Sequence, residues 1–322
     1  MNDKISHRAQ VPPELAHLRL DQVAAKLFQD YSRSRLQEWI QSGELRVNGA
    51  KRRPRDKLAA GDELVLEAVV SHEQPWHAEP LPIDPVYQDK HVLVLNKPAG
   101  LVVHPAAGNW QGTLLNGLLH AFPELENLPR AGIVHRLDKD TTGLMVVARS
   151  LKAHTSLVAQ LQARSVSREY EAVASGRLTA GGTVDAPLGR HPVNRKKRAV
   201  LDSEFGGQEA VTHYRILNRF RAHTHLKLNL ETGRTHQIRV HMAHIGFPLV
   251  GDPLYAGRLR MPAEASQTLR EALRQFRRQA LHARRLGFCH PDTEREVNFE
   301  APCPADMQAL LDVLQAEETG DG

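Results

Sequence analysis

The chain has 322 residues, which allows one or two domains, and its composition is that of an ordinary globular protein. It carries 42 Lys and Arg against 37 Asp and Glu, a modest positive balance that suits an anionic partner such as nucleic acid. No stretch reaches the ~18 continuous apolar residues of a membrane span, and the start, MNDKISHRAQ, lacks the apolar segment of a signal peptide. The two cysteines have no metal or redox spacing, so we expect a cytoplasmic protein without membrane contact.

The first quarter of the chain predicts a small domain. Apolar residues recur at helical spacing within residues 18–43, which predicts a pair of short helices. A strand with a tight turn through Asn48-Gly49 follows, and residues 62–70 alternate like a second strand. The next stretch is rich in proline and polar residues. We therefore predict a domain over residues 1–75, a linker over 76–84 and a second domain over 85–322.

The second domain combines strands with separate helices. Helical spacing predicts helices at 113–122 and at 234–246, the latter ended by Gly246. Strands and helices do not alternate as regular βαβ units, which favours an α+β fold. The predicted strands cover residues 91–98, 144–149, 168–176, 210–217 and 225–230.

Arginine and lysine come in runs. Two runs are KRRPRDK at 51–57 and RHPVNRKKR at 190–198, and a third group lies near the end of the chain. Any one run is ordinarily a solvated surface, but three in separate segments favour a phosphate-binding surface. The third group consists of Arg274, Arg277, Arg278, Arg284 and Arg285.

Several reaction classes find no support. Asp138, Asp140 and Thr142 imitate the opening of a calcium loop, but its twelfth position is Arg149 instead of glutamate. His241 and His244 lack further ligands at zinc spacing. Neither a nucleotide-binding glycine loop nor a GxSxG nucleophile motif occurs. We expect no metal and no small-molecule cofactor.

Asp138 is the candidate for chemistry. It lies in the stretch GIVHRLDKDTTGLMVV, between the basic residues His135, Arg136 and Lys139 and just before an apolar strand. Neighbouring cations keep a carboxylate ionised, and an ionised carboxylate acts as a nucleophile or an electrostatic stabiliser. The alternative is an aspartate that caps a turn and pairs with Arg136.

An aromatic residue and two arginines complete the candidate site. Tyr170 lies on a predicted strand, and Arg234 and Arg239 are five positions apart, which leaves one of them free to turn inward. A tyrosine ring stacks on bases, and an arginine orients a carboxylate. The alternative for Tyr170 is a core aromatic of the sheet.

Four segments carry a resemblance to a known family. The central one, GIVHRLDKDTTGLMVVAR (132–149), closely resembles the main motif of the RluA family of RNA pseudouridine synthases. NKPAGLVVHP (96–105), SREYEAV (167–173) and residues 231–257 resemble its other motifs, in the same order, over about residues 80–305. The resemblance implies a catalytic domain built on a mixed, largely antiparallel sheet with flanking helices. Residues 19–64 resemble the small RNA-binding domain named after ribosomal protein S-four, here as an α/β unit.

The resemblance also implies roles for single residues. Asp138 is then the catalytic aspartate, Tyr170 stacks on the target uracil and takes the carbon-5 proton, and Arg239 pairs with Asp138. Arg136 fills the gap that the flipped uridine leaves in the RNA. Attack on the ribose, elimination to a glycal and addition to carbon 6 of the base all stay open, because each needs an ionised aspartate. The remaining RNA contacts implied are His135, Arg33, Arg35, Lys51, Arg52, Arg53 and Arg234.

Within this family, the motifs HRLDKDTTG, PRAG (129–132) and VGDPLYAG look most like those of members that modify large-subunit ribosomal RNA. We therefore expect isomerisation of specific uridines to pseudouridine in a stem-loop of 23S rRNA, by a monomer that acts on this RNA or on the assembling large subunit. Two alternatives stay open. One is a pseudouridine synthase for another rRNA or tRNA uridine, and the other is mainly an RNA chaperone or ribosome assembly factor.

Overall fold

The computed structural model describes the chain except residues 1–2, 29–30, 32, 71–75, 106–108 and 321–322. It divides into two compact units, Met1–Trp76 and His77–Gly322. Each has apolar core clusters built from its own residues alone. No helix in the described residues is both long enough and apolar enough to cross a membrane.

The N-terminal unit packs two helices against a three-stranded sheet of order β1-β3-β2. The predicted helix pair and the turn are confirmed, and Asn48 and Gly49 both adopt positive φ, of 50° and 74°. Strand β1 was not predicted, since it carries few apolar residues and is defined by eight pairings with β3. In chain order the elements are β1 Asp3–Gln10, the 3₁₀ turn Pro13–Leu15, α1 Leu20–Leu27, α2 Arg33–Ser42, β2 Leu45–Val47 and β3 Glu63–Val70.

The C-terminal unit is built on a nine-stranded sheet with the path β4-β5-β6-β13-β7-β12-β11-β8, to which β14 adds beside β13. Every pairing in it is antiparallel except β6 with β13, so the mixed, largely antiparallel sheet predicted for this domain is confirmed. The strands are β4 Pro85–Gln88, β5 Val92–Lys97, β6 Thr142–Ala148, β7 Ser167–Ser175, β8 Gly182–Asp185, β11 Val211–Arg219, β12 His223–Leu230, β13 Leu281–Cys289 and β14 Glu296–Glu300.

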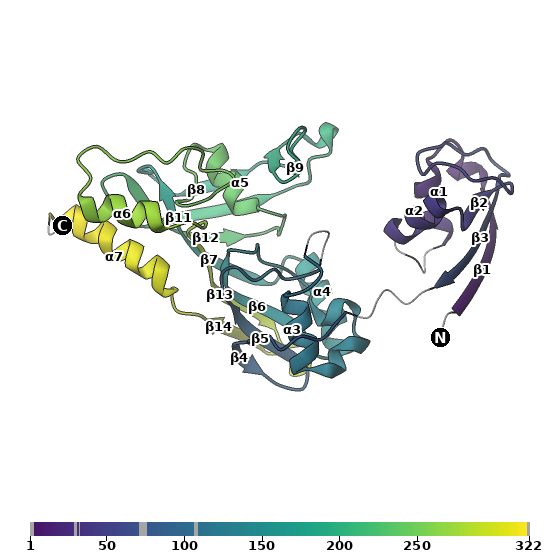
Figure 1. The fold of residues 1–322 in the computed structure, drawn as a ribbon, viewed down its shortest axis with the longest axis horizontal. Coiled ribbons are helices and arrows are strands. Elements are labelled where there is room, and N and C mark those ends of the chain that lie inside the picture. The colour runs from purple at the N-terminus through teal and green to yellow at the C-terminus, as the bar shows by residue number, and fades with distance from the viewer. Residues whose placement is uncertain (1–2, 29–30, 32, 71–75, 106–108, 321–322) are drawn as a thin grey trace. The chain divides into compact units, whose positions relative to one another are not determined.

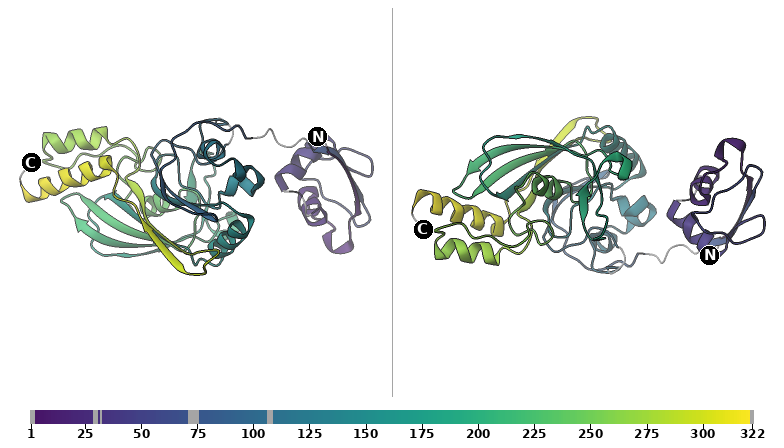
Figure 2. Two further views of the ribbon diagram at one scale, coloured as in Figure 1. Left: turned by 90° about the horizontal axis from the view of Figure 1, so that it is seen from below. Right: turned by 90° about the horizontal axis from the view of Figure 1, so that it is seen from above.

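Helices cover this sheet from two ends. Figures 1 and 2 show α6 and α7 side by side at the end of the unit opposite α3 and α4. The α-helices are α3 Leu114–Ala121, α4 Leu151–Gln162, α5 Gln237–His244, α6 Gln267–Gln275 and α7 Ala305–Thr319, and the 3₁₀ turns are Pro123–Asn127, Pro129–Gly132 and Ser203–Phe205. A separate hairpin pairs β9 Leu188–Arg190 with β10 Arg198–Val200.

Strand β6 lies at the centre of the sheet, and all seven of its residues are buried. Such a strand is apolar throughout because both of its faces are covered. Gly143 has a φ of 113°, and a Cβ there would come 2.3 Å from the carbonyl oxygen of Ala283 on β13. Glycine at this position therefore permits the close parallel approach of β13 to the strand that follows Asp138.

The helix predicted at 234–246 is shorter in the structure. It begins at Gln237, because His236 adopts a left-handed backbone with φ of 59°. The Gln237 side chain stabilises the preceding turn: its Oε1 accepts hydrogen bonds from the Arg234 backbone amide at 2.9 Å and from the Thr232 hydroxyl at 2.8 Å. Arg234 and Arg239 therefore lie on different elements, and only Arg239 is on the helix.

Candidate active site

The centre of the candidate site is an ion pair between Asp138 and Arg239. Asp138 lies in the turn before β6, and its carbonyl oxygen accepts the amide hydrogen of Thr141 at 3.1 Å. Arg239, on α5, donates from Nη1 to Asp138 Oδ2 at 2.8 Å. The two residues are 101 positions apart in the sequence, and the structure brings them together. The carboxylate therefore pairs with a distant arginine, in place of the turn cap with Arg136 considered as the alternative.

Arg239 is itself held by a second carboxylate. Its Nε and Nη2 donate to the two oxygens of Asp252 at 2.7 and 2.9 Å, a two-bond arrangement that fixes the plane of the guanidinium. Arg239 is 4 % exposed and the Asp252 side chain is fully buried. Burial opposes the charged form, but the hydrogen bonds and negative charges of Asp252 and Asp138 raise the pKa of Arg239 above its ordinary value. The arginine is thus a permanent cation aimed at one oxygen of Asp138.

Tyr170 lies on β7, between Leu228 of β12 and Ala283 of β13 in the sheet register. It is 7 % exposed. Burial raises the pKa of its hydroxyl; the positive charge of Arg168 opposes this shift, and the charge of Asp138 adds to it. Tyr170 is therefore a neutral phenol that is electrostatically coupled to Asp138, with a ring held by a central strand.

Lys97 was missed as a site residue, although it belongs to the NKPAG motif. It is fully buried, and its Nζ donates to the carbonyl oxygens of Pro98 at 2.8 Å, Leu101 at 3.0 Å and Lys139 at 2.8 Å. Burial lowers its pKa to about 7, against the opposing charges of Asp140 and Asp138. Lys97 thereby ties the loop after β5 to the turn that carries Asp138.

His135 does not add positive charge near Asp138, contrary to the expectation from sequence. Its Nε2 accepts the backbone hydrogen of Val146 at 3.0 Å, a bond that joins the loop to β6. Burial lowers its pKa to about 3, and the positive charge of Arg168 contributes. The expected positive charge of His135 is therefore corrected, because the ring is neutral and bonds β6, and its contact with RNA stays a prediction. Arg136 and Lys139 are exposed.

Three arginines of the third basic group predicted from the sequence pair with carboxylates of neighbouring elements. Arg278 pairs with both oxygens of Asp306 at 2.7 and 2.8 Å. Arg284 and Arg285 both pair with Glu300. Arg278 is buried in its ion pair, whereas Arg274, Arg277 and Arg285 are exposed, so the expectation of a phosphate-binding surface stays a prediction for these three.

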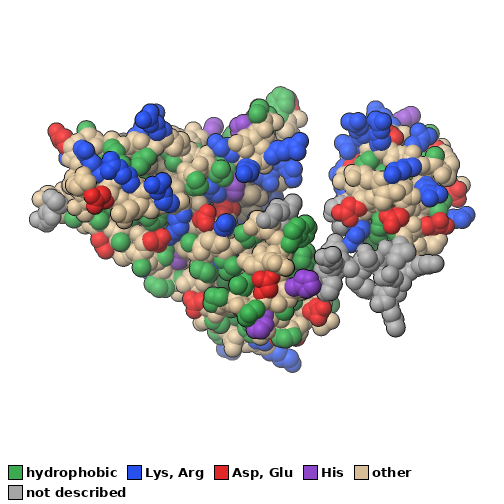
Figure 3. All heavy atoms as spheres, in the orientation of Figure 1, with side chains coloured by type: hydrophobic (Ala, Val, Ile, Leu, Met, Phe, Trp, Pro, Cys, Tyr) green, Lys and Arg blue, Asp and Glu red, His purple; other side chains and the backbone are tan. Residues whose placement is uncertain are grey.

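Three of the residues predicted to contact RNA lie in an exposed basic loop of the N-terminal unit, between β2 and β3. Lys51, Arg52 and Arg53 are exposed to solvent, and Lys and Arg side chains gather on the face of this unit seen in Figure 3. Arg33 pairs with the fully buried Asp21 at 2.7 Å, and Arg35 pairs with Glu38 at 3.4 Å. In the other unit, Arg234 is exposed and donates from Nε to the carbonyl oxygen of Glu209 at 3.1 Å.

Possible metal ligands do not cluster in the part of the chain that the structure describes, where no three or more His, Cys, Asp or Glu side chains come together. His241 is fully buried, and its ring nitrogens bond the Thr212 hydroxyl and the Ala186 carbonyl oxygen, both at 2.9 Å. Its bonds are therefore those of a core residue that packs α5 against β11.

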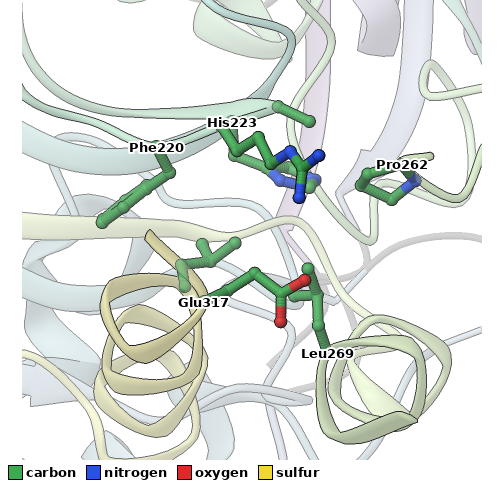
Figure 4. A pocket seen from close by; sticks show the side chains of 8 residues that line it. Phe220, His223, Pro262, Leu269 and Glu317 are labelled. Carbon is green, nitrogen blue, oxygen red and sulfur yellow. The ribbon is translucent and has the colours of Figure 1, made fainter. Parts of the chain in front are cut away.

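A small hollow lies apart from this site, between the β11–β12 turn and helices α6 and α7. Figure 4 shows Phe220, His223, Pro262, Leu269 and Glu317 around it. His223 is 4 % exposed, and burial lowers its pKa to about 4, so the ring is neutral. Asp138, Tyr170 and Arg239 do not line this hollow, which is therefore separate from the candidate site.

A mixed sheet that carries an arginine-paired aspartate beside a buried tyrosine defines a class of enzyme. Residues 91–244 match the family described as RNA pseudouridylate synthase, and residues 18–64 match the S4 domain. The chain belongs to the RNA pseudouridylate synthase family, and it is an RNA pseudouridine synthase with an N-terminal S4 RNA-binding domain.

Relatives with full-length similarity support this placement. The chain is 60 % identical to the ribosomal large subunit pseudouridine synthase D of Pseudomonas aeruginosa, with 98 % of both chains covered. It is 51 % identical to the protein of the same name from Escherichia coli K12, over 98 % of this chain and 97 % of the other. Among solved structures, human RNA pseudouridylate synthase domain containing 4 is 28 % identical, with a TM-score of 0.57, over 72 % of this chain and 93 % of that one.

Proposed function

We propose that this enzyme converts specific uridines of large-subunit ribosomal RNA, in a 23S rRNA stem-loop, to pseudouridine. The relatives with full-length similarity carry names that state this class of substrate. The observation that carries the chemistry is the arrangement around Asp138, in which one carboxylate oxygen is bound by Arg239 and Arg239 is bound in turn by the buried Asp252. A carboxylate held in this way is charged and fixed in direction.

In the proposed reaction the bond between the ribose C1′ and the base N1 breaks, the uracil turns, and a new bond joins C1′ to C5. The hydrogen on C5 is lost and N1 gains one, so the product is an isomer of the substrate. One bond to C1′ replaces another within the same nucleoside, and the reaction therefore needs no oxidant and no second substrate. Asp138 supplies the negative charge at C1′ or at the base, Arg239 orients it, and Tyr170 lies against the uracil and takes the C5 proton.

A stacked uridine cannot present these atoms, so the target nucleotide has to leave the RNA stack. Flipping a base costs a few kcal/mol, least in loops and mismatches. Stacking on an aromatic ring such as Tyr170 returns about 1–3 kcal/mol. We infer that the exposed Arg136 fills the vacated position in the RNA, because it lies two residues before Asp138. We infer that Arg234 contacts the RNA backbone, because it lies in the segment that leads into the helix of Arg239.

We propose that the N-terminal unit holds the RNA through phosphates. Its exposed basic loop with Lys51, Arg52 and Arg53 supports this, with Arg33 and Arg35 on α2 as further contacts. Phosphate contacts set register and orientation on an RNA, whereas splayed bases carry its sequence. The family resemblance supports a monomer, and a substrate of this kind supports a cytoplasmic location.

The test is release of tritium from RNA labelled at uracil C5. Unmodified 23S rRNA, assembling large subunits and tRNA are supplied in parallel, with Asp138→Asn as the inactive control. We expect release from 23S rRNA or from the assembling subunit by the wild type alone. Release from tRNA only would replace the proposed substrate, and binding without release from any RNA would favour a chaperone or assembly factor.

A further inference from the structure

A second residue faces the carboxylate of Asp138. His236 Nε2 lies 3.9 Å from Asp138 Oδ1, on the opposite oxygen from the one that Arg239 binds. His236 is the residue before α5, and its φ of 59° and ψ of 20° lie in the left-handed region. Residues other than glycine adopt this backbone at a cost, and such positions concentrate at functional sites. The backbone conformation thus directs the imidazole toward the free oxygen of Asp138.

The other ring nitrogen of His236 is bound by Tyr255. The Tyr255 hydroxyl lies 2.7 Å from His236 Nδ1, and it also accepts the backbone hydrogen of Arg198 at 2.9 Å. A phenol has one hydrogen of its own to donate. The Tyr255 hydroxyl oxygen already accepts a hydrogen bond from the Arg198 amide. The hydroxyl hydrogen of Tyr255 is therefore used when Tyr255 donates it to His236 Nδ1. A neutral His236 then carries its hydrogen on Nε2, the nitrogen that faces Asp138.

The surroundings of His236 keep the ring neutral. Burial lowers its pKa below the ordinary value; Asp138 opposes this shift, and the positive charge of Arg239 favours it. A neutral N–H that faces a carboxylate oxygen from 3.9 Å attracts it as a dipole, without compensating its charge as a second cation would. Asp138 Oδ2 is already bound to a cation, so a neutral N–H at 3.9 Å from Oδ1 leaves the negative charge of that oxygen uncompensated.

Tyr255 is fixed by the same aspartate that holds Arg239. The Tyr255 backbone amide donates to Asp252 Oδ1 at 3.1 Å, and its ring centre lies 5.1 Å from the Arg239 guanidinium carbon. On its other side the tyrosine reaches the β9–β10 hairpin, through the Arg198 amide and through Lys197 Nζ at 5.9 Å from the ring. Tyr255 therefore connects a basic hairpin to both groups that contact Asp138.

We propose that Tyr255 is a positioning residue, which holds His236 in the Nε2–H tautomer so that a neutral donor faces the open oxygen of Asp138. His236 acts through Asp138 and is a positioning residue as well. The role in catalysis rests on the proposed pseudouridine reaction, whereas the tautomer is a property of the free protein.

The tautomer is measured directly by nitrogen NMR of the full chain labelled at histidine. The signal of His236 is assigned by its loss in His236→Gln. We expect wild-type His236 to show a protonated Nε2 and an unprotonated Nδ1, and Tyr255→Phe to show a mixture of the two forms. A protonated Nδ1 in the wild type would overturn the proposal, whether or not the enzyme makes pseudouridine from the RNA supplied.

The catalytic part is measured by single-turnover rates in a double-mutant cycle. Tyr255→Phe is expected to lower the rate by about tenfold, the size of one lost hydrogen bond to a charged network, with RNA affinity unchanged. Glutamine has no tautomers and carries its amide near the position of Nε2, so in a His236→Gln background the same change is expected to cost less than about twofold. Equal losses in both backgrounds would show that Tyr255 acts only on the structure.

A matched control is Tyr87→Phe, which removes a hydroxyl that donates to Asp89 at 2.9 Å, on β4 and outside the catalytic group. It is expected to leave both the rate and the histidine signal of residue 236 unchanged. A similar loss of rate in Tyr87→Phe would assign the effect to general destabilisation and would also overturn the proposal.

Discussion

Arg239 and Asp252 form a buried ion pair through two hydrogen bonds, from Nε and Nη2 of the arginine. The third guanidinium nitrogen of Arg239, Nη1, donates to Asp138. The direction of the Asp138 carboxylate thus depends on a residue that does not touch it. Asp252 also accepts the backbone hydrogens of Leu254 and Tyr255 at 2.8 and 3.1 Å. One buried carboxylate therefore organises the arginine and the loop beside it.

Asp252→Asn should lower both stability and activity. It leaves the Arg239 charge buried with one of its two carboxylate partners gone, and breaking a buried pair costs about 3–5 kcal/mol of unfolding free energy. Urea denaturation measures this loss, and tritium release measures the activity. Asp306→Asn is the control, because its half-exposed carboxylate also binds an arginine through two bonds, away from the site. Full activity in Asp252→Asn would contradict the role given to the pair.

Lys97 predicts a dependence of stability on pH. Its pKa falls from 10.5 to about 7 on folding, so between these values the unfolded chain binds more protons than the folded one. Stability contributed by this group therefore rises with pH across that window, by at most about 1.4 kcal/mol per pH unit, and the cost of burying the charge is fully present below pH 7. Lys97→Met removes this slope.

The measurement is urea unfolding of the wild type and Lys97→Met at several pH values between 7 and 9.5. The difference in stability is expected to shift in favour of the wild type as pH rises. Lys90→Met changes an exposed lysine and serves as the control. A constant difference would show that Lys97 stays an ammonium, whose three hydrogens match its three carbonyl acceptors.

Removal of residues 1–76 should leave a folded catalytic unit with weaker RNA binding. The core clusters of the C-terminal unit that the described residues form are built from that unit's own residues, so we expect it to fold by itself. Circular dichroism and thermal melting test the fold, and RNA affinity at several salt concentrations tests the binding. A truncated enzyme with unchanged affinity and target choice would refute the role given to the S4 domain.

Joint replacement of Lys51, Arg52 and Arg53 by alanine should flatten the salt dependence of RNA binding. Each phosphate contact contributes roughly 0.7–0.9 to the slope of log affinity against log salt, so three contacts account for roughly 2–3. Binding is measured in full-length protein from low to moderate salt. Lys90→Ala is the single-charge control on the other unit, and an unchanged slope in the triple variant would show that these residues do not touch phosphates.

The sequence predicted most elements whose signals are local. The α1 and α2 pair follows from apolar spacing, and the strands around Asp138 and Tyr170 follow from apolar runs bounded by turns. The predicted helix began at residue 234, three residues before the helix of the structure. The difference arises because His236 adopts a left-handed backbone, which a histidine in the sequence does not indicate. Strand β1 was missed because its pairing with β3 spans more than fifty positions, and its own residues are mostly polar.

The charges of the site were less predictable, because they depend on partners far apart in the chain. Arg278 was counted as an RNA-facing cation, yet it binds Asp306, 28 positions later. His135 was counted as a cation beside Asp138, yet its burial against β6 keeps it neutral. Asp252 and Lys97 were not predicted as site residues, although both lie in motifs that carry the family resemblance. Each is a charged residue in a largely apolar motif, and this was the signal in the sequence that could have indicated them.

The strand order β6-β13-β7 has a consequence for the synthesis of this enzyme. Asp138 precedes β6 and Tyr170 lies on β7, but the strand between them, β13, is made about 110 residues after Tyr170. A nascent chain that has already emerged with Asp138, Tyr170 and Arg239 still lacks the strand that sets their spacing. Ribosome-bound chains that end before Leu281 are therefore expected to be inactive, and the candidate site is completed only once β13 has been made.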